Sequence, residues 1–450
     1  MSNAVIRTCK YFEAIILILA DRYTIIGKGV TLLQQSRKSK FAKQAGILFV
    51  CNVLSRGISF FANAYAARCL GAFNFGVSGV IQNMAKPASL FADLGFDSVA
   101  TRKIASDADK ALQLTSLIIG IRVLFTLLIG IIWLVVCFCL FEGRELMIWS
   151  ISSILLFNDA SFGALRLTFA YQGLERVHIQ TIISTLGSVL IAVLYFIYFH
   201  RDMPMGSDLL VLVSVNSLVV FASWVYFFKN IGRIHLFNLS FAKTLELLKE
   251  SWPFGWNNFV MFLYGGFQLP LIAFFIGTEG AGIFRAAWTM SNVLQLLFNS
   301  ISFLLIPRLT KWRERGAEVL KTKQTLLVKL YLLMGVPIII VLALFSDLIF
   351  NLFLGPAFHA SSGIFKILIV AWLIAFIAQI FSLSLIVLKK DKHFAVISTV
   401  GAIVSVGLNL IFLPIFGLYA AAVVTIINET FIGFIFYYFY QKHKNDHSTA

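Results

Sequence analysis

The sequence predicts an all-α polytopic membrane protein, with about twelve transmembrane helices in two six-helix lobes. Three observations predict this class: the composition, a series of apolar windows, and the placement of the basic residues. Of the 450 residues, 59% are hydrophobic and 13% are charged, and the mean hydropathy is +0.87. A soluble domain carries about 25% charged residues, so the composition excludes that class.

Twelve apolar windows are each long enough to cross a hydrocarbon core about 30 Å thick, because a helix rises about 1.5 Å per residue. The second, fourth and seventh of these windows are the least hydrophobic. The windows are 44–67, 75–96, 115–141, 146–170, 178–200, 208–229, 252–276, 281–306, 326–354, 364–388, 394–415 and 417–440.

The basic residues predict how the chain is oriented. With the N-terminus inside, the cytoplasmic segments hold 27 Lys and Arg residues and the opposite loops hold three. This bias follows the positive-inside rule, so both termini are expected in the cytoplasm. It also explains the net charge of +16 without a nucleic-acid partner. The predicted parts are a cytoplasmic leader 1–43, an N-terminal lobe 44–229, a linker 230–251, a C-terminal lobe 252–440 and a tail 441–450.

A weak internal repeat relates the two predicted lobes. The segment Leu70–Met84 aligns without gaps on Ile276–Met290, and in each lobe this segment joins the first two spans on the far side. A displacement of six spans preserves direction, so the sequence predicts a pseudo-two-fold axis along the membrane normal. Coincidence in a chain rich in Gly and Phe is the alternative. The identical pairs are Gly71 with Gly277, Gly76 with Gly282 and Met84 with Met290.

Ionisable residues deep in the spans are the candidate site residues, because each costs roughly 2.5–3.5 kcal/mol at the centre of a membrane helix. We expect Arg56, Lys86 and Arg285 to be cavity cations that bind an anionic substrate. Asp159 and Glu429 are candidates for coupling transport to an ion. An internal salt bridge, such as Arg56 or Lys86 with Asp159, is the open alternative for this group.

A second group of charges lies nearer the span ends, where long side chains can snorkel at low cost. For these residues a structural role is the first expectation. Asp93 is also a candidate for ion coupling, and it is expected to pair with a cation near the cytoplasmic rim. The group is Asp93, Arg122, Arg166, Lys329 and Lys366.

The sequence gives no support for a catalytic or metal site. The seven His residues are scattered, and the five Cys residues show no metal-ligand spacing. No HExxH, GxSxG, P-loop or paired-Cys zinc pattern occurs. We therefore expect a non-enzyme without a metal or a cofactor.

Six short motifs then resemble those of the Wzx-type O-antigen and polysaccharide flippases. These belong to the multidrug/oligosaccharidyl-lipid/polysaccharide exporter superfamily. The motifs follow one another in the expected order between about residues 44 and 440, whereas the leader 1–43 is not covered. They are Arg68–Gly76, Ala92–Phe96, Tyr171–Arg176, Gly282–Ala287, Ile306–Arg308 and Phe416–Ala422.

The resemblance implies two six-helix lobes around a cationic cavity in the bacterial inner membrane. It implies alternating-access translocation of an undecaprenyl-pyrophosphate-linked repeat unit from the cytoplasmic to the periplasmic leaflet. Lipid-linked oligosaccharide and membrane lipid are then the expected partners, with a polysaccharide polymerase and a chain-length regulator from the same pathway. A multidrug or cation exporter of the same superfamily is the main alternative, although the deep cations disfavour it. An integral-membrane polymerase is the weaker alternative.

Overall fold

The computed structural model describes residues 32–140, 143, 148–150, 154, 159, 163–234 and 241–443. The side chains of 32–45, 140, 241–242 and 295–304 are outside this description. The chain divides into two compact units, Met1–Val50 and Cys51–Ala450, and the second unit carries every feature discussed below. Most of the predicted leader, about half of the fourth predicted span and the end of the tail lie outside the described residues.

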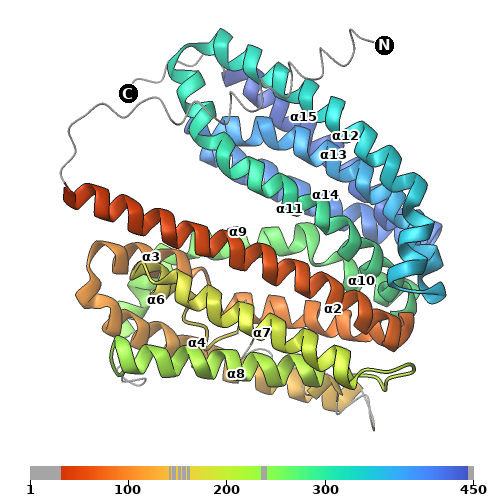
Figure 1. Ribbon diagram of the computed structural model, residues 1–450, viewed down its shortest axis with the longest axis horizontal. Helices are drawn as coiled ribbons and strands as arrows, with labels where there is room; N and C mark the ends of the chain where they lie inside the picture. The colour runs from red at the N-terminus through yellow and green to blue at the C-terminus, as the bar shows by residue number, and fades with distance from the viewer. Residues whose placement is uncertain are drawn as a thin grey trace. The chain divides into compact units, whose positions relative to one another are not determined.

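The described chain is helical throughout and contains no strand, which confirms the all-α class (Figure 1). The helices before the predicted linker are α2 (Leu32–Asp93), α3 (Phe96–Ser106), α4 (Ala111–Leu140), α6 (Thr168–Gly173), α7 (Val177–Tyr198) and α8 (Ser207–Asn230). Those after it are α9 (Phe241–Gly265), α10 (Gln268–Ile276), α11 (Thr278–Glu314), α12 (Ala317–Phe353), α13 (His359–Val387), α14 (Asp391–Phe416) and α15 (Leu418–His443). Short 3₁₀ turns cover Ala108–Lys110 and Pro356–Phe358.

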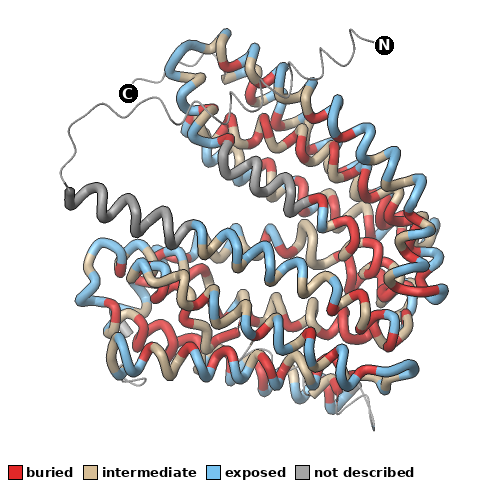
Figure 2. Tube along the Cα trace, in the orientation of Figure 1, coloured by how far each residue is buried: buried red, intermediate tan, exposed pale blue. Residues whose placement is uncertain are grey.

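Eight of the described helices are long and apolar enough to cross a membrane, and the bent pair α9 and α10 makes a ninth. One of the eight, α2, contains the first predicted span and most of the second, and α11 contains the eighth predicted span. Large apolar side chains are exposed along these helices, for example Leu344 at 73%. Figure 2 shows exposed residues, in pale blue, spread along the helices. Hydrocarbon as the surrounding solvent explains such exposure. The chain is therefore a multi-pass membrane protein, and the count of twelve stays a prediction.

A reversal within α2 separates its two predicted spans. Gly71 has φ 73° and ψ 172°, which interrupts the helix and which a residue with a Cβ would adopt only with strain. On one side of Gly71, the Ser55 hydroxyl lies 2.7 Å from that of Ser188 in α7. On the other, the Ser78 hydroxyl donates to Asp208, at the start of α8, over 2.5 Å. The chain thus runs along α7 and turns back, as the hairpin prediction requires.

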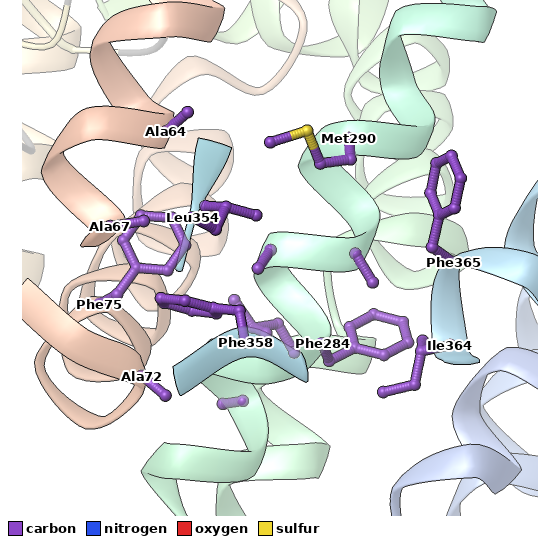
Figure 3. Packing of buried hydrophobic residues seen from close by; sticks show 14 of the residues in the cluster. Ala64, Ala67, Ala72, Phe75, Phe284, Met290, Leu354, Phe358, Ile364 and Phe365 are labelled. Carbon is purple, nitrogen blue, oxygen red and sulfur yellow. The ribbon is translucent and has the colours of Figure 1, made fainter. Parts of the chain in front are cut away.

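A large buried cluster joins elements that are far apart in the sequence. Figure 3 shows Phe75 of α2 facing Phe358, with Phe284 of α11 beside them. The Phe75 and Phe358 rings meet edge to face, with their centroids 6.0 Å apart. All three side chains are almost fully buried. Aromatic packing of this kind stabilises the contact between the two halves of the chain.

Candidate functional site

The break between α9 and α10 shapes the cavity that we consider the candidate site. The break falls at Gly265-Gly266, two residues that leave the backbone unusually free, and the two helices meet at 41°. The amides of Gly266 and Phe267 both donate to the carbonyl of Phe262, over 2.7 and 3.0 Å, which closes the end of α9. Gly265 and Gly266 line one cavity together with residues from the second half of α2.

A cavity of about 440 Å³ lies between α2, α9 and α11. We call it the Lys86 cavity, because Lys86 is the one charged residue among the described residues that line it. Its volume lies within the range of about 300–1,000 Å³ that is typical of small-molecule sites. Its lining is Asn83, Lys86, Leu90, Met261, Phe262, Gly265, Gly266 and Trp288.

Lys86 is positioned by the α2 helix and by its neighbour one turn earlier. Its ammonium donates to Oδ1 of Asn83 over 3.3 Å, and within the described chain this is its only hydrogen bond. An ammonium has three donors, so two remain for a ligand or water. Pro87 follows within the helix and lacks the N–H that would bond to the Asn83 carbonyl. The site thus offers a cation, an amide and a freed carbonyl.

The other two predicted cavity cations lie elsewhere. Arg56 is exposed on α2, and no described residue forms a hydrogen bond or ion pair with it. Arg285 of α11 is partly buried and reaches back to α2. Its Nη1 donates to the Phe75 carbonyl over 2.6 Å, and its guanidinium carbon lies 4.0 Å from the centre of the Phe75 ring. Of the three predicted cavity cations, Lys86 lines this cavity, whereas Arg56 and Arg285 do not.

The predicted carboxylates fall in three separate surroundings. Asp159 accepts a hydrogen bond from the amide of Asn216 in α8 over 3.4 Å, and its charge acts on Lys86. Glu429 of α15 accepts one from the hydroxyl of Tyr264. Asp93 is buried in a network of ion pairs near the start of α3.

This network joins Asp93 and Asp97 to Arg122 and Arg166. Arg122 pairs with both carboxylates, while Arg166 lies 3.1 Å from Asp93 and 2.5 Å from Asp97. The expected pairing of Asp93 is thus confirmed. Snorkelling was the wrong explanation for Arg122, because its side chain is 1% exposed and its charge is neutralised internally.

Asp97 lies at the start of α3, outside the membrane spans, and its pKa reflects the same network. Burial raises the pKa of Asp97. The charges of Arg122 and Arg166 and their hydrogen bonds lower the pKa by a larger amount, so the net shift is downward. The carboxylate is therefore held in its charged form. The network has two charges of each sign, which indicates a structural lock rather than an anion site.

Sequence reasoning missed most of the lining of the Lys86 cavity. Asn83 could have been found, since it lies one helical turn before Lys86. Trp288 and Met261 carried no local signal, because apolar residues are frequent on every helix of this chain.

With this geometry in place, comparison with known proteins decides the family. The model of the family described as "Polysaccharide biosynthesis protein" matches residues 41–313. The chain belongs to this family. Together with relatives and solved structures of the exporter superfamily, the match confirms the resemblance to Wzx-type flippases.

Curated proteins named as transporters or flippases align over most of the chain. The "Putative O-antigen transporter" of Escherichia coli (strain K12) is 25% identical over 65% of this chain and 71% of its own length. The "Putative O-antigen transporter" of Shigella dysenteriae is 24% identical over 80% of this chain and 89% of its own length. The "Probable low-salt glycan biosynthesis flippase Agl15" of Haloferax volcanii is 20% identical, over 84% and 79%.

Solved structures of transporters share the fold. The lipid II flippase MurJ in an inward closed conformation superposes with a TM-score of 0.70 at 15% identity, over 88% of this chain and 87% of its own. An inward-facing multidrug resistance MATE family transporter of the MOP superfamily gives 0.65 at 14% identity, over 89% and 100%. These similarities establish the two-lobe architecture and are too distant to transfer a substrate.

Proposed function

We propose that this protein is a flippase for a lipid-linked polysaccharide precursor. Relatives named as O-antigen transporters and as a glycan biosynthesis flippase support a transporter rather than an enzyme. The observation that carries the proposal is the Lys86 cavity, where a cation with unused donors faces a space between the two halves of the chain. Lys86 would bind the charged head of the precursor while the lipid tail stays in the bilayer.

The finer proposal concerns the chemistry of the substrate and the path. The precursor would be an undecaprenyl-pyrophosphate-linked O-antigen or related repeat unit, moved from the cytoplasmic to the periplasmic leaflet by alternating access. The distribution of basic residues supports an inner-membrane protein with both termini in the cytoplasm. A polysaccharide polymerase and a chain-length regulator would use the product. Arg56 and Arg285 would add positive charge along the path. Asp159 would couple transport to an ion, with Glu429 as the alternative, whereas Asp93 is already neutralised in its ion-pair network.

Gene deletion followed by complementation tests the proposal. A flippase deletion should remove the surface polysaccharide and accumulate the lipid-linked repeat unit, whose chemical analysis identifies the substrate. Complementation with Lys86→Ala should give about a tenfold lower level of surface polysaccharide at equal protein abundance, since a charged hydrogen bond to the substrate is lost. Lys86→Arg is the control that keeps the charge. Normal surface polysaccharide with Lys86→Ala would rule out the cavity assignment.

Export of drugs or other cations is the second candidate, and the fold shared with the MATE transporter supports it. Drug-resistance profiling of an overexpressing strain separates the two functions. Increased resistance together with unchanged surface polysaccharide in the deletion strain would favour the exporter. A deletion strain that still displays single repeat units would instead indicate a polymerase.

A further inference from the structure

A second pocket lies in the C-terminal half of the chain, and nothing above assigns it a ligand. It occupies about 220 Å³ between α9, α13, α14 and α15. We call it the aromatic pocket, after the five aromatic side chains in its wall. The lining is Met261, Tyr264, Trp372, Ala375, Phe376, Ala378, Gln379, Ser382, Phe394, Ser398, Glu429, Ile432 and Phe436.

The aromatic pocket adjoins the Lys86 cavity. Met261 lines both spaces, so they adjoin each other at this residue of α9. Trp288 on the cavity side and Trp372 on the pocket side have ring centroids 5.6 Å apart. The two spaces are therefore neighbours, and a ligand held at Lys86 would have to extend past Met261 to reach the pocket.

Two stacked pairs of rings give the aromatic pocket flat apolar walls. The rings of Trp372 and Phe376 stack at 22° with centroids 6.0 Å apart. Those of Phe394 and Phe436 stack at 27° with centroids 5.7 Å apart. A pyranose ring presents a face of C–H groups and an edge of hydroxyl groups, so a flat aromatic wall fits its face.

The Glu429 carboxylate supplies a hydrogen-bond acceptor for the hydroxyl groups at the edge of a sugar ring. Glu429 accepts a hydrogen bond from Tyr264, its only donor within the described chain. It forms no ion pair with any cation of the described residues. A carboxylate has roughly four acceptor positions, so most of them are available to sugar hydroxyl groups. Ser398 and Gln379 line the same pocket and provide further polar groups.

We propose that the aromatic pocket binds a sugar unit of the lipid-linked glycan while Lys86 holds its phosphate. This inference rests on the proposed function and adds to it a site for the glycan. The volume of about 220 Å³ is below the range of about 300–1,000 Å³ for drug-sized ligands, which suits one sugar ring. In the described chain, no cluster of three or more His, Cys, Asp or Glu residues suggests a metal ion instead.

Binding to two lipids that differ only in the glycan tests the inference. The probes are the lipid-linked oligosaccharide purified from the deletion strain and undecaprenyl pyrophosphate without sugar. Equilibrium binding is measured with labelled protein in detergent. Trp372→Leu and Glu429→Gln should each weaken binding of the glycan-bearing lipid about tenfold and change binding of the sugar-free lipid less than about twofold. Lys86→Ala should weaken the binding of both lipids by the same factor.

The control variant is Glu279→Gln, an equivalent change on an exposed carboxylate at the start of α11, and it should bind both lipids normally. Equal losses for both lipids in the pocket variants, or no loss for either, would overturn the inference. The inference would also be overturned if sodium protected the Glu429 carboxyl from chemical modification and the glycan-bearing lipid did not. That result would assign the pocket to an ion. If wild-type protein binds neither lipid, or if Lys86→Ala leaves both unchanged, the proposed function itself fails.

Discussion

The two aligned hairpins of this protein share a similar backbone break at a glycine. Gly71 ends the first arm of one at φ 73° and ψ 172°, and Gly277 ends that of the other at φ 101° and ψ 168°. Both values lie in a region that favours glycine over any residue with a Cβ. Equal geometry at aligned positions makes coincidence a poor explanation for the sequence repeat.

The hairpins also contact each other reciprocally. A Cβ on Gly76 would lie 1.8 Å from the Thr278 carbonyl oxygen, and a Cβ on Gly282 would lie 1.8 Å from that of Ala72. Ala72 aligns with Thr278 as Gly76 aligns with Gly282, so the contact has approximate two-fold symmetry. Small residues allow membrane helices to approach this closely.

The side chains of the hairpins break this symmetry. Within the aligned segment Gly79 corresponds to Arg285, whose side chain lies directly against Gly79. Continued without gaps beyond Met84, the alignment places Lys86 opposite Asn292. The backbone repeat therefore builds the frame, while unlike side chains give the Lys86 cavity charge on one wall only. An asymmetric substrate requires such a difference, and the following predictions test it.

The largest effect is expected where the two hairpins touch. Gly76→Leu and Gly282→Leu should each reduce surface polysaccharide more than about tenfold, because a side chain would collide with a carbonyl oxygen and force the helices apart. The measurement is surface polysaccharide at matched protein abundance. Gly57→Leu on α2 is the control, since no heavy atom lies within 4 Å of its added Cβ. Wild-type display with Gly76→Leu would contradict the close contact.

The ion-pair network sharpens the comparison, because Asp93 and Asp97 align with the uncharged Asn299 and Phe303. Asp97→Asn should lower the free energy of unfolding by about 3 kcal/mol at pH 7, the low end of the range for breaking a buried pair. The lowered pKa of Asp97 means that its contribution is complete above about pH 4 and is lost as the pH falls further.

Denaturant unfolding in detergent at several pH values measures this effect. The difference between wild type and Asp97→Asn should be constant from about pH 8 to pH 5 and narrow below about pH 4. A difference that does not vary with pH down to about pH 3 would show that packing, not charge, is responsible.

A smaller effect is expected at Gly79 and Arg285, which occupy aligned positions in the two hairpins and contact each other. Gly79→Ala would place a Cβ 2.5 Å from Cδ of Arg285, so it should destabilise the protein. In Gly79→Ala/Arg285→Ala the clash is absent, and the two changes should couple by about 1 kcal/mol in a double-mutant cycle of unfolding. Strictly additive free energies would show that the two side chains do not contact each other.

The smallest effect is expected at the exposed contact between α3 and α9. Lys103 lies 2.6 Å and Arg102 lies 3.4 Å from the carboxylate of Glu250, and all three side chains are accessible to water. Glu250→Gln should change the free energy of unfolding by less than about 1 kcal/mol, and high salt should remove the difference. A larger change would mean that this contact helps to hold α3 against α9.

The class, the break at Gly265-Gly266 and the reversal at Gly71 could be read from the sequence, because they depend on local hydropathy and glycine. The partners of the charges could not. Arg122 lies near one end of its predicted span, and only the fold brings Asp93 and Asp97 to its side chain. Likewise Lys86 was identified as costly in a membrane, but its surroundings come from three helices.

The sequence by itself determined that the chain is a helical membrane protein with a repeated hairpin, since both properties are written in consecutive residues. The tertiary structure decided which charges are neutralised and which line a cavity. That distinction depends on contacts such as Arg285 with Phe75, 210 residues apart in the chain. An isolated span carries the cost of its charge, whereas the folded chain determines what offsets that cost.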